Sequence, residues 1–247
     1  MDIAEHIKFV AREGELLADA AEQAGPDAPV PTCPGWCVRD LLRHTGMVHR
    51  WAAAFVREGH TEYHPDGGEP DLDGAALLRW FREGHGLLVT ALTEAPGDLE
   101  CWTFMPASSP LAFWARRQAH ETAVHRVDAE SALGAEEFTV DTAFAVDGID
   151  ELLVAFHARG KSRVRTPEPA TLRIRATDTG DVWTLDLSEQ APRTTRSDEG
   201  PADCEVSADA DRLYAALWNR LPAGAVTVTG DGRLARLWRE KSGITWA

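Results

Sequence analysis

The sequence predicts an α+β protein with two parts, a helical N-terminal domain and a small α/β C-terminal domain. Apolar residues recur near the 3.6-residue period over most of the first 160 positions, a pattern typical of amphipathic helices. From about position 170 the pattern changes to alternation, which is typical of half-buried strands. A segment at 161–169 with Lys, Arg and two Pro separates the two patterns. We therefore expect domains at 1–162 and 163–247.

The N-terminal domain is expected to hold five helices. Gly25 and Pro26 end the first, and Pro96 and Gly97 end the third. Cys37 stands at the start of the second helix with Asp40 three residues later, which is a weakened capping box. Before the fourth, Ser108 or Ser109 can cap and Pro110 suits the first turn. The expected helices cover 3–21, 37–51, 74–95, 110–134 and 139–158.

The C-terminal domain is expected to combine strands with two short helices. The alternating runs at 171–177 and 182–187 flank a turn with Gly180, so they predict a hairpin. Further strands are expected at 204–207 and 225–229. The apolar spacing predicts helices at 209–220 and 233–240.

The composition of the chain excludes several classes of function. The chain has 247 residues, 44% of them hydrophobic, and a formal net charge of -15. The acidic balance argues against general nucleic-acid binding and against docking on anionic lipid. No apolar run approaches the length of a bilayer span, and the N-terminus has no features of a signal peptide. Cys33 and Cys37 lack the spacing of a redox pair, so we expect reduced cysteines and a cytoplasmic protein.

The fourth helix carries the pattern with the clearest chemical meaning. Glu121 and His125 are four residues apart, which puts both side chains on one helix face at the spacing that two ligands of one metal need. His120 is rotated by about 140° from His125, so this is not the motif of zinc proteases. Buried polar groups need partners. The partner is a metal, or alternatively an arginine network with Arg117 or Arg126.

A third metal ligand has to come from another helix, and the second helix offers two histidines. His44 lies among apolar residues and is expected to face inward. His49 is rotated by about 140° from His44 and precedes Arg50, which suggests a place at the rim. Two helices of a bundle can build a His-Glu-His site in the core. Three protein ligands leave a position for water or substrate, as in catalytic metal sites.

Two segments carry a resemblance to a known family. The segment from Val30 to His44 reads Val-Pro-Thr-Cys-Pro-Gly-Trp-Cys-Val-Arg-Asp-Leu-Leu-Arg-His and is followed by His49-Arg-Trp51. This segment resembles the N-terminal signature of the mycothiol-dependent maleylpyruvate isomerase family, which belongs to the DinB-like four-helix-bundle superfamily. The segment from Arg117 to Asp128 is similar to that family's second signature. The resemblance covers essentially the whole chain.

The resemblance implies a set of site residues. In the family a divalent metal, usually zinc, is held by residues that fall on His44, Glu121 and His125. The C-terminal domain resembles the family's small α/β domain, which is related in shape to sterol-carrier domains and provides a catalytic arginine. Arg220 stands at that position, after Asn219 where a Gly is expected. On its residues alone, Arg220 would interact only with the end of its helix.

By this resemblance the protein is a metal- and mycothiol-dependent enzyme that adds a thiolate to a small electrophile, with maleylpyruvate-like substrates isomerised from cis to trans. The first alternative is a mycothiol S-transferase in detoxification or natural-product biosynthesis. The second is a non-catalytic protein that binds a metal and an apolar ligand, with Asp128 or Cys101 as candidates to close the metal site. Expected partners are small molecules only, with no nucleic acid and no membrane. The sequence leaves open the electrophile, the metal in the cell, and whether the protein is a monomer or a small homo-oligomer.

Overall fold

The computed structural model describes residues 1–135 and 138–244 of the chain. Contacts between residues group the chain into two compact units, 1–136 and 137–247. The first is called the helical unit and the second the sheet unit, and each is described by itself. Together they have the α+β fold class that the sequence predicts. None of the described helices is long and apolar enough to cross a membrane.

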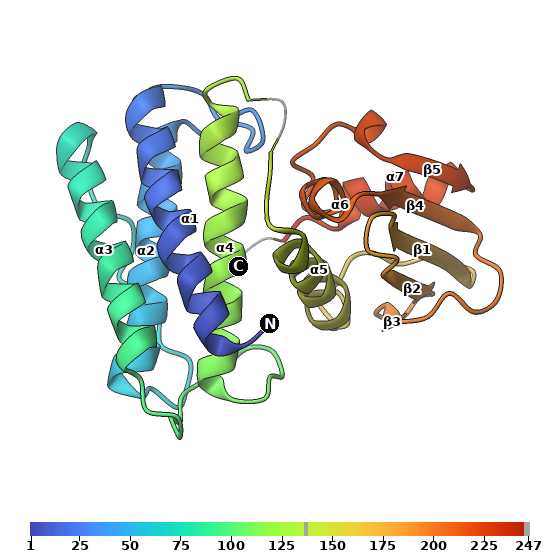
Figure 1. Ribbon diagram of the computed structural model, residues 1–247, viewed down its shortest axis with the longest axis horizontal. Coiled ribbons are helices and arrows are strands. Elements are labelled where there is room, and N and C mark those ends of the chain that lie inside the picture. Colours follow the sequence, from blue (N-terminus) through green and yellow to red (C-terminus); the bar gives the residue numbers. More distant parts are fainter. Residues whose placement is uncertain (136–137, 245–247) are drawn as a thin grey trace. The chain divides into compact units, whose positions relative to one another are not determined.

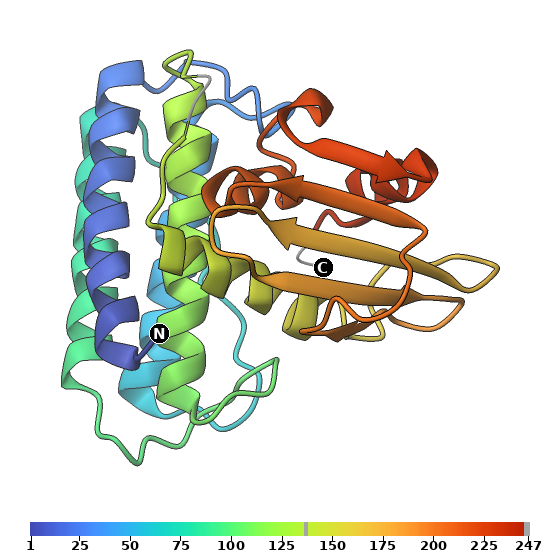
Figure 2. The same ribbon diagram turned by 45° about the vertical axis from the view of Figure 1, so that its right-hand side comes forward.

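The helical unit is built from four long helices that run side by side (Figures 1 and 2). The most extensive contacts join α1 to α4 and α2 to α3, and α2 also contacts α4. The core between them includes Leu17, Leu41, Leu77 and Phe81, all completely buried. The helices are α1 (Ile3–Ala24), α2 (Val38–Glu58), α3 (Gly74–Glu94) and α4 (Pro110–Ser131).

The helix starts follow the predicted capping residues. The Ser109 hydroxyl accepts a hydrogen bond from the Ala112 amide at 3.1 Å, and Pro110 begins α4. At α2 the Cys37 amide and thiol both donate to the Asp40 carboxylate, at 2.9 and 3.0 Å. These contacts fix where each helix begins and so which face each side chain occupies.

A closed loop precedes α2. Pro29 and Cys37 form an isolated antiparallel bridge, and the Val30 amide donates to the Trp36 carbonyl at 3.0 Å. Gly35 has a φ of 89°, a left-handed conformation that glycine adopts without strain. The loop therefore holds residues 31–36 in one arrangement directly beside the first turn of α2.

The sheet unit begins with α5 (Thr142–Asp150), whose last residues continue into a π-helical turn, η1 (Glu151–Phe156). Its five strands pair in the order β3-β2-β1-β4-β5. The predicted hairpin is present, with β1 antiparallel to β2, while β1 and β4 are parallel. The strands are β1 (Ala170–Ala176), β2 (Val182–Leu187), β3 (Arg193–Thr195), β4 (Cys204–Ala208) and β5 (Thr227–Gly230), and the remaining helices are α6 (Ala210–Leu217), the 3-10 turn η2 (Ala223–Ala225) and α7 (Gly232–Lys241).

The division between the units differs from the boundary after residue 162 that the sequence analysis gave. Helix α5 was placed with the bundle because of its helical periodicity, yet it packs on α6 inside the sheet unit. The rings of Phe144 and Tyr214 are 6.1 Å apart in this contact. Periodicity shows that a helix has an apolar face but not which element that face meets.

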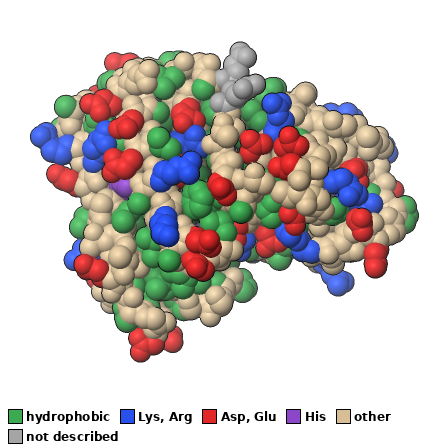
Figure 3. All heavy atoms as spheres, viewed as in Figure 1, with side chains coloured by type: hydrophobic (Ala, Val, Ile, Leu, Met, Phe, Trp, Pro, Cys, Tyr) green, Lys and Arg blue, Asp and Glu red, His purple; other side chains and the backbone are tan. Residues whose placement is uncertain are grey.

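Charged side chains of both signs are interspersed over the surface. On the face that Figure 3 shows, Lys and Arg side chains lie scattered among Asp and Glu side chains. One such group joins Arg82 of α3 to Glu15, Asp19 and Glu22 of α1 at 2.8–3.1 Å. All four cysteines are free thiols, as the sequence predicts.

Candidate functional site

Helix α4 is buried on nearly all sides, and this burial includes many of its polar residues. Burying charge is unfavourable unless each charge has a partner. Arg126 has two partners, because its Nε lies 2.6 Å from Glu13 Oε2 and its Nη1 donates to Glu130 Oε1 at 2.7 Å. An arginine network of the kind considered from the sequence therefore exists, in which Arg126 contacts Glu13 and Glu130. A second arginine, Arg117, donates from Nη2 to Glu121 Oε2 at 3.5 Å, which leaves the other oxygen of Glu121 to a different set of contacts.

Glu121 lies between two histidines. Its Oε1 is 3.3 Å from His125 Nε2 and 3.9 Å from His44 Nε2. Helix α2 supplies His44, and α4 supplies the other two residues one turn apart. One potential ligand atom from each of the three lies within 4.8 Å of the others. Glu121 and His125 are each 7% exposed, so the group is shielded from bulk water without being sealed.

The electrostatics of the group favour positive charge beside Glu121. Burial opposes ionisation of Glu121, but its contacts with His125 and His44 and the charge of Arg117 outweigh burial and hold the pKa well below its usual range. Burial acts against the protonated form of His125 as well. Asp128 and Glu121 oppose that effect and raise the pKa of His125 to about 9. The site therefore stabilises a cation between these side chains.

The residues fit a divalent metal ion. Two imidazole nitrogens and a carboxylate oxygen are ligands that zinc prefers. Two ligands of a tetrahedral zinc ion, each about 2.1 Å from it, lie about 3.4 Å apart. The 3.3 Å between His125 and Glu121 matches that spacing, and the 3.9 Å to His44 exceeds it by about half an ångström. A small inward movement of His44 would complete the set.

Two neighbouring side chains hold the histidine rings. His125 Nδ1 is 2.8 Å from Asp128 Oδ2, on the opposite side of the ring from Glu121. The Trp36 ring lies nearly parallel to that of His125, at 19° and 6.4 Å between centroids, and meets His44 edge-on at 5.1 Å. Asp128 and Cys101 are the possible fourth ligands that the sequence suggests. Neither belongs to the group of ligand atoms around Glu121.

His49 does not lie at the rim, where the sequence analysis placed it. It is completely buried, its Nε2 is 3.0 Å from Thr122 Oγ1, and burial lowers its pKa well below the usual range. The prediction was wrong because α2 is covered by α3 on one side and by α4 on the other, so both of its faces are internal. His49 and the buried His120 both lie outside the group around Glu121.

Arg220 lies just beyond the end of α6 in the sheet unit. Its amide donates to the Ala215 carbonyl and its Nη1 to the Trp218 carbonyl, both at 2.8 Å. Asn219 has a φ of 61°, a left-handed conformation in which Asn is the usual substitute for Gly. This explains why the sequence pattern calls for Gly there. The role of Arg220 toward a substrate stays a prediction.

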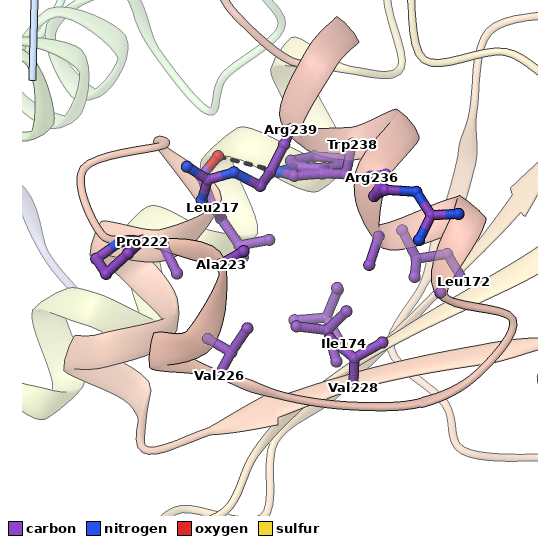
Figure 4. A pocket seen from close by; sticks show the side chains of 14 residues that line it. Leu172, Ile174, Leu217, Pro222, Ala223, Val226, Val228, Arg236, Trp238 and Arg239 are labelled. Carbon is purple, nitrogen blue, oxygen red and sulfur yellow. Dashed lines mark hydrogen bonds between the residues drawn. The ribbon is translucent and has the colours of Figure 1, made fainter.

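The sheet unit contains an apolar cavity of about 250 Å³ (Figure 4). No sequence motif marks this cavity, because its lining residues come from three strands, two helices and the turn η2. Trp238 closes one wall and donates its Nε1 hydrogen to the Leu217 carbonyl at 3.0 Å. The guanidinium groups of Arg236 and Arg239 lie at the edge. The apolar lining includes Leu172, Ile174, Val228, Leu217 and Trp238.

The fold and the site together define a class: a helical bundle with a buried His-Glu-His group on two helices, joined in one chain to a small α+β unit. Family models describe the same two parts. The mycothiol maleylpyruvate isomerase N-terminal domain matches residues 10–130, and the C-terminal domain of that family matches residues 143–237. The chain therefore belongs to the mycothiol maleylpyruvate isomerase family, a family of enzymes, as the resemblance implied.

Solved structures agree on the fold. A crystal structure of the mycothiol-dependent maleylpyruvate isomerase is similar with a TM-score of 0.65, 13% sequence identity and 93% of each chain covered. A structure of a histidine-to-alanine mutant of that enzyme is similar with a TM-score of 0.66 at the same identity and coverage. No curated protein sequence matches the chain.

Proposed function

We propose that this protein is a metal-dependent enzyme that uses mycothiol as its thiol and acts on a small electrophile. The observation that carries the proposal is the meeting of His44, Glu121 and His125 in a member of this family, with their ligand atoms within 4.8 Å of one another. The two nitrogens and the carboxylate would hold a divalent ion, with zinc preferred by the donor set. Three protein ligands leave room for one further donor.

The residues of the site support thiol chemistry in distinct ways. A zinc ion, when bound, lowers the pKa of a coordinated thiol and so supplies a thiolate at neutral pH. Glu121 provides the negative charge that retains the cation, and the two imidazoles complete the neutral donors. The thiols of the chain lie outside the group around Glu121, so the nucleophile has to come from the cosubstrate.

The reaction class that fits is cis-trans isomerisation of an activated double bond. The mycothiol thiolate adds to the double bond of a maleylpyruvate-like substrate, the new single bond rotates, and elimination returns the trans isomer with the thiol. Arg220 would bind a carboxylate or the developing enolate, because a guanidinium forms paired hydrogen bonds with such groups. Transfer of the thiol to another electrophile uses the same residues and is distinguished by a stable thioether product.

A screen of the zinc-loaded protein with mycothiol and candidate electrophiles, read by mass spectrometry, tests this proposal. We expect isomerised substrate, or a thioether if the protein is an S-transferase. Glu121→Gln should abolish turnover, whereas Glu130→Gln, which changes a carboxylate of α4 outside the group around Glu121, should retain it. Full turnover without thiol would contradict the proposal.

Thiol binding can also be measured without knowing the electrophile. Mycothiol should bind to the zinc-loaded protein with release of a proton, because the thiolate is the form that binds a metal. Calorimetry in two buffers of different ionisation enthalpy measures that release. Binding without proton release would leave the metal site in place but remove the proposed thiol activation.

The apolar cavity favours a second candidate, a protein that binds a metal and an apolar ligand without catalysis. Its volume of about 250 Å³ is slightly below the usual range of ligand pockets, which begins at about 300 Å³. Calorimetric titration with a medium-chain fatty acid tests it. Ala223→Trp, at an exposed lining residue, should weaken binding, and Ala225→Trp in the same turn serves as control. Absence of binding, together with thiol-dependent turnover, would exclude this candidate.

A further inference from the structure

Asp128 is a buried carboxylate beside the proposed metal site that is not itself one of the proposed ligands. It lies on α4 one turn beyond His125 and is completely buried. Its Oδ2 is 2.8 Å from His125 Nδ1, while His125 Nε2 is 3.3 Å from Glu121. The two ring nitrogens of His125 therefore face two different carboxylates. An ionised carboxylate can only accept, so Nδ1 donates its hydrogen to Asp128.

The second oxygen of Asp128 is also engaged, by a residue distant in sequence. Thr32 donates its hydroxyl hydrogen to Asp128 Oδ1 at 2.6 Å. The nearby Ser131 hydroxyl donates to the Asp128 backbone carbonyl at 2.7 Å, so it does not compete for this oxygen. Thr32, Asp128 and His125 thus form a continuous hydrogen-bonded relay.

The relay begins in the closed loop before α2. The Pro29–Cys37 bridge and the hydrogen bond from Val30 to Trp36 hold that loop together. The same loop places Trp36 nearly parallel to His125 and edge-on to His44. One rigid segment therefore constrains the His125 ring by a hydrogen-bonded carboxylate and by an aromatic ring.

His44 differs from His125 in this respect. The carboxylate one turn before it on α2, Asp40, accepts hydrogen bonds from the amide and the thiol of Cys37 at the start of the helix and is not a partner of the His44 ring. Its contacts are with Glu121 at 3.9 Å and with the rings of Trp36 and His125. Of the two histidines, His125 is thus the one whose orientation is fixed before a cation arrives.

We propose that Asp128 and Thr32 are positioning residues that keep the Nδ1 hydrogen of His125 on Asp128 and direct Nε2, the nitrogen that would bind the metal after losing its own proton, toward Glu121 and His44. The inference rests on the proposed metal site, which it deepens by assigning a role to residues outside the ligand set. A carboxylate on the outer nitrogen orients the imidazole and increases its basicity. Loss of such a partner typically weakens metal binding about 10–100-fold.

Zinc affinity, measured by competition with a chromophoric chelator, tests the relay without any substrate. Asp128→Asn should weaken zinc binding about 10–100-fold. Thr32→Val should weaken it less, and Thr32→Ser, which keeps the hydroxyl, should restore wild-type affinity. In the Asp128→Asn background, Thr32→Val should cause no further loss of zinc affinity, because the carboxylate that Thr32 positions is no longer present. Thr122→Val removes a buried α4 hydroxyl outside the relay and is the matched control.

A second measurement reports the protonation and ligation of the His125 ring directly. In zinc-loaded wild type, nitrogen NMR should show His125 protonated at Nδ1 and ligated through Nε2, and Thr32→Val should alter the Nδ1–H signal. If Asp128→Asn fails to fold, the pair Thr32→Val and Thr32→Ser carries the test. Zinc binding by wild type that both Asp128→Asn and Thr32→Val leave unchanged would overturn the relay alone. Wild type that binds no zinc would overturn the metal site and the relay together.

Discussion

Two buried histidines, one in each unit, differ in what surrounds them. His125 in the helical unit lies between Glu121 and Asp128, and these carboxylates raise its pKa to about 9 against the effect of burial. His157 in the sheet unit contacts the Ser162 hydroxyl at 3.0 Å and the Trp238 ring at 4.6 Å. Burial lowers the pKa of His157 to about 4, only partly opposed by a backbone hydrogen bond with Ser242.

The comparison teaches that burial alone does not make a cation site. Both histidines are at least nine-tenths buried, yet one environment favours positive charge and the other excludes it. The difference comes from the carboxylates that α4 places at three- and four-residue spacings around His125. A buried cluster of acceptors on this helix has the electrostatics that a divalent ion requires, whereas His157 has those of a structural histidine.

Removing the central carboxylate should have the largest effect. Glu121→Gln keeps the size of the side chain but removes the charge that both histidines face. We expect zinc affinity to fall by more than about 100-fold, beyond the usual cost of losing an outer partner. Chelator competition measures it, with Glu130→Gln as the control that keeps wild-type affinity. Equal losses in both variants would mean that net charge, rather than the group around Glu121, governs binding.

The next largest effect concerns the free energy of unfolding, which should fall at low pH because of His157. Its pKa is about 4 in the folded protein and 6.5 unperturbed, so the unfolded chain takes up the proton first as pH falls. Its stability contribution is therefore complete above pH 6.5 and is lost progressively toward pH 4, by about 3 kcal/mol in total.

Urea unfolding of wild type and His157→Gln across this pH range measures that loss. The wild type should lose more stability than the variant on acidification. Parallel pH profiles would show that the imidazole is not held neutral in the folded state.

Substitution of Arg220 should have the smallest and most specific effect. If its guanidinium binds a substrate carboxylate through two hydrogen bonds, Arg220→Lys should impair turnover nearly as much as Arg220→Ala, because an ammonium cannot reproduce the planar fork. Loss of such a charged hydrogen bond costs about 1.5–3 kcal/mol, or roughly 10–100-fold in kcat/KM. The measurement is kcat/KM of wild type and both variants at constant metal content. Unchanged kinetics in Arg220→Ala would leave it as a residue that only binds the end of its helix.

Much of the fold could be predicted because local patterns control it. The four bundle helices and the β1–β2 hairpin follow from apolar periodicity, capping residues and the turn at Gly180. Strand β3 was not predicted, since Arg193-Thr-Thr195 has no apolar alternation and pairs with β2 through its backbone. The π-helical turn after α5 was missed as well, because one extra residue per turn leaves no mark in a short apolar run.

The candidate site was predictable only in part. The four-residue spacing placed Glu121 and His125 on one face of α4. The apolar neighbours of His44 favoured that residue as the third ligand, and the resemblance implied the same three residues. The contacts of Asp128 and Trp36 with the histidine rings depend on side-chain orientation and on a loop distant in sequence. Residue spacing along the chain does not reveal either of these. The burial of His49 depends on a neighbouring helix that covers the far side of α2.

Anomalous diffraction at the zinc edge, from crystals grown with zinc, tests the central claim most directly. The account predicts one zinc ion per chain, about 2.0–2.2 Å from His44 Nε2, a Glu121 oxygen and His125 Nε2, with a further position left for a non-protein donor. His49 and His120 should lie outside its coordination sphere. A zinc ion bound elsewhere, or these three side chains pointing apart in the presence of zinc, would contradict the account.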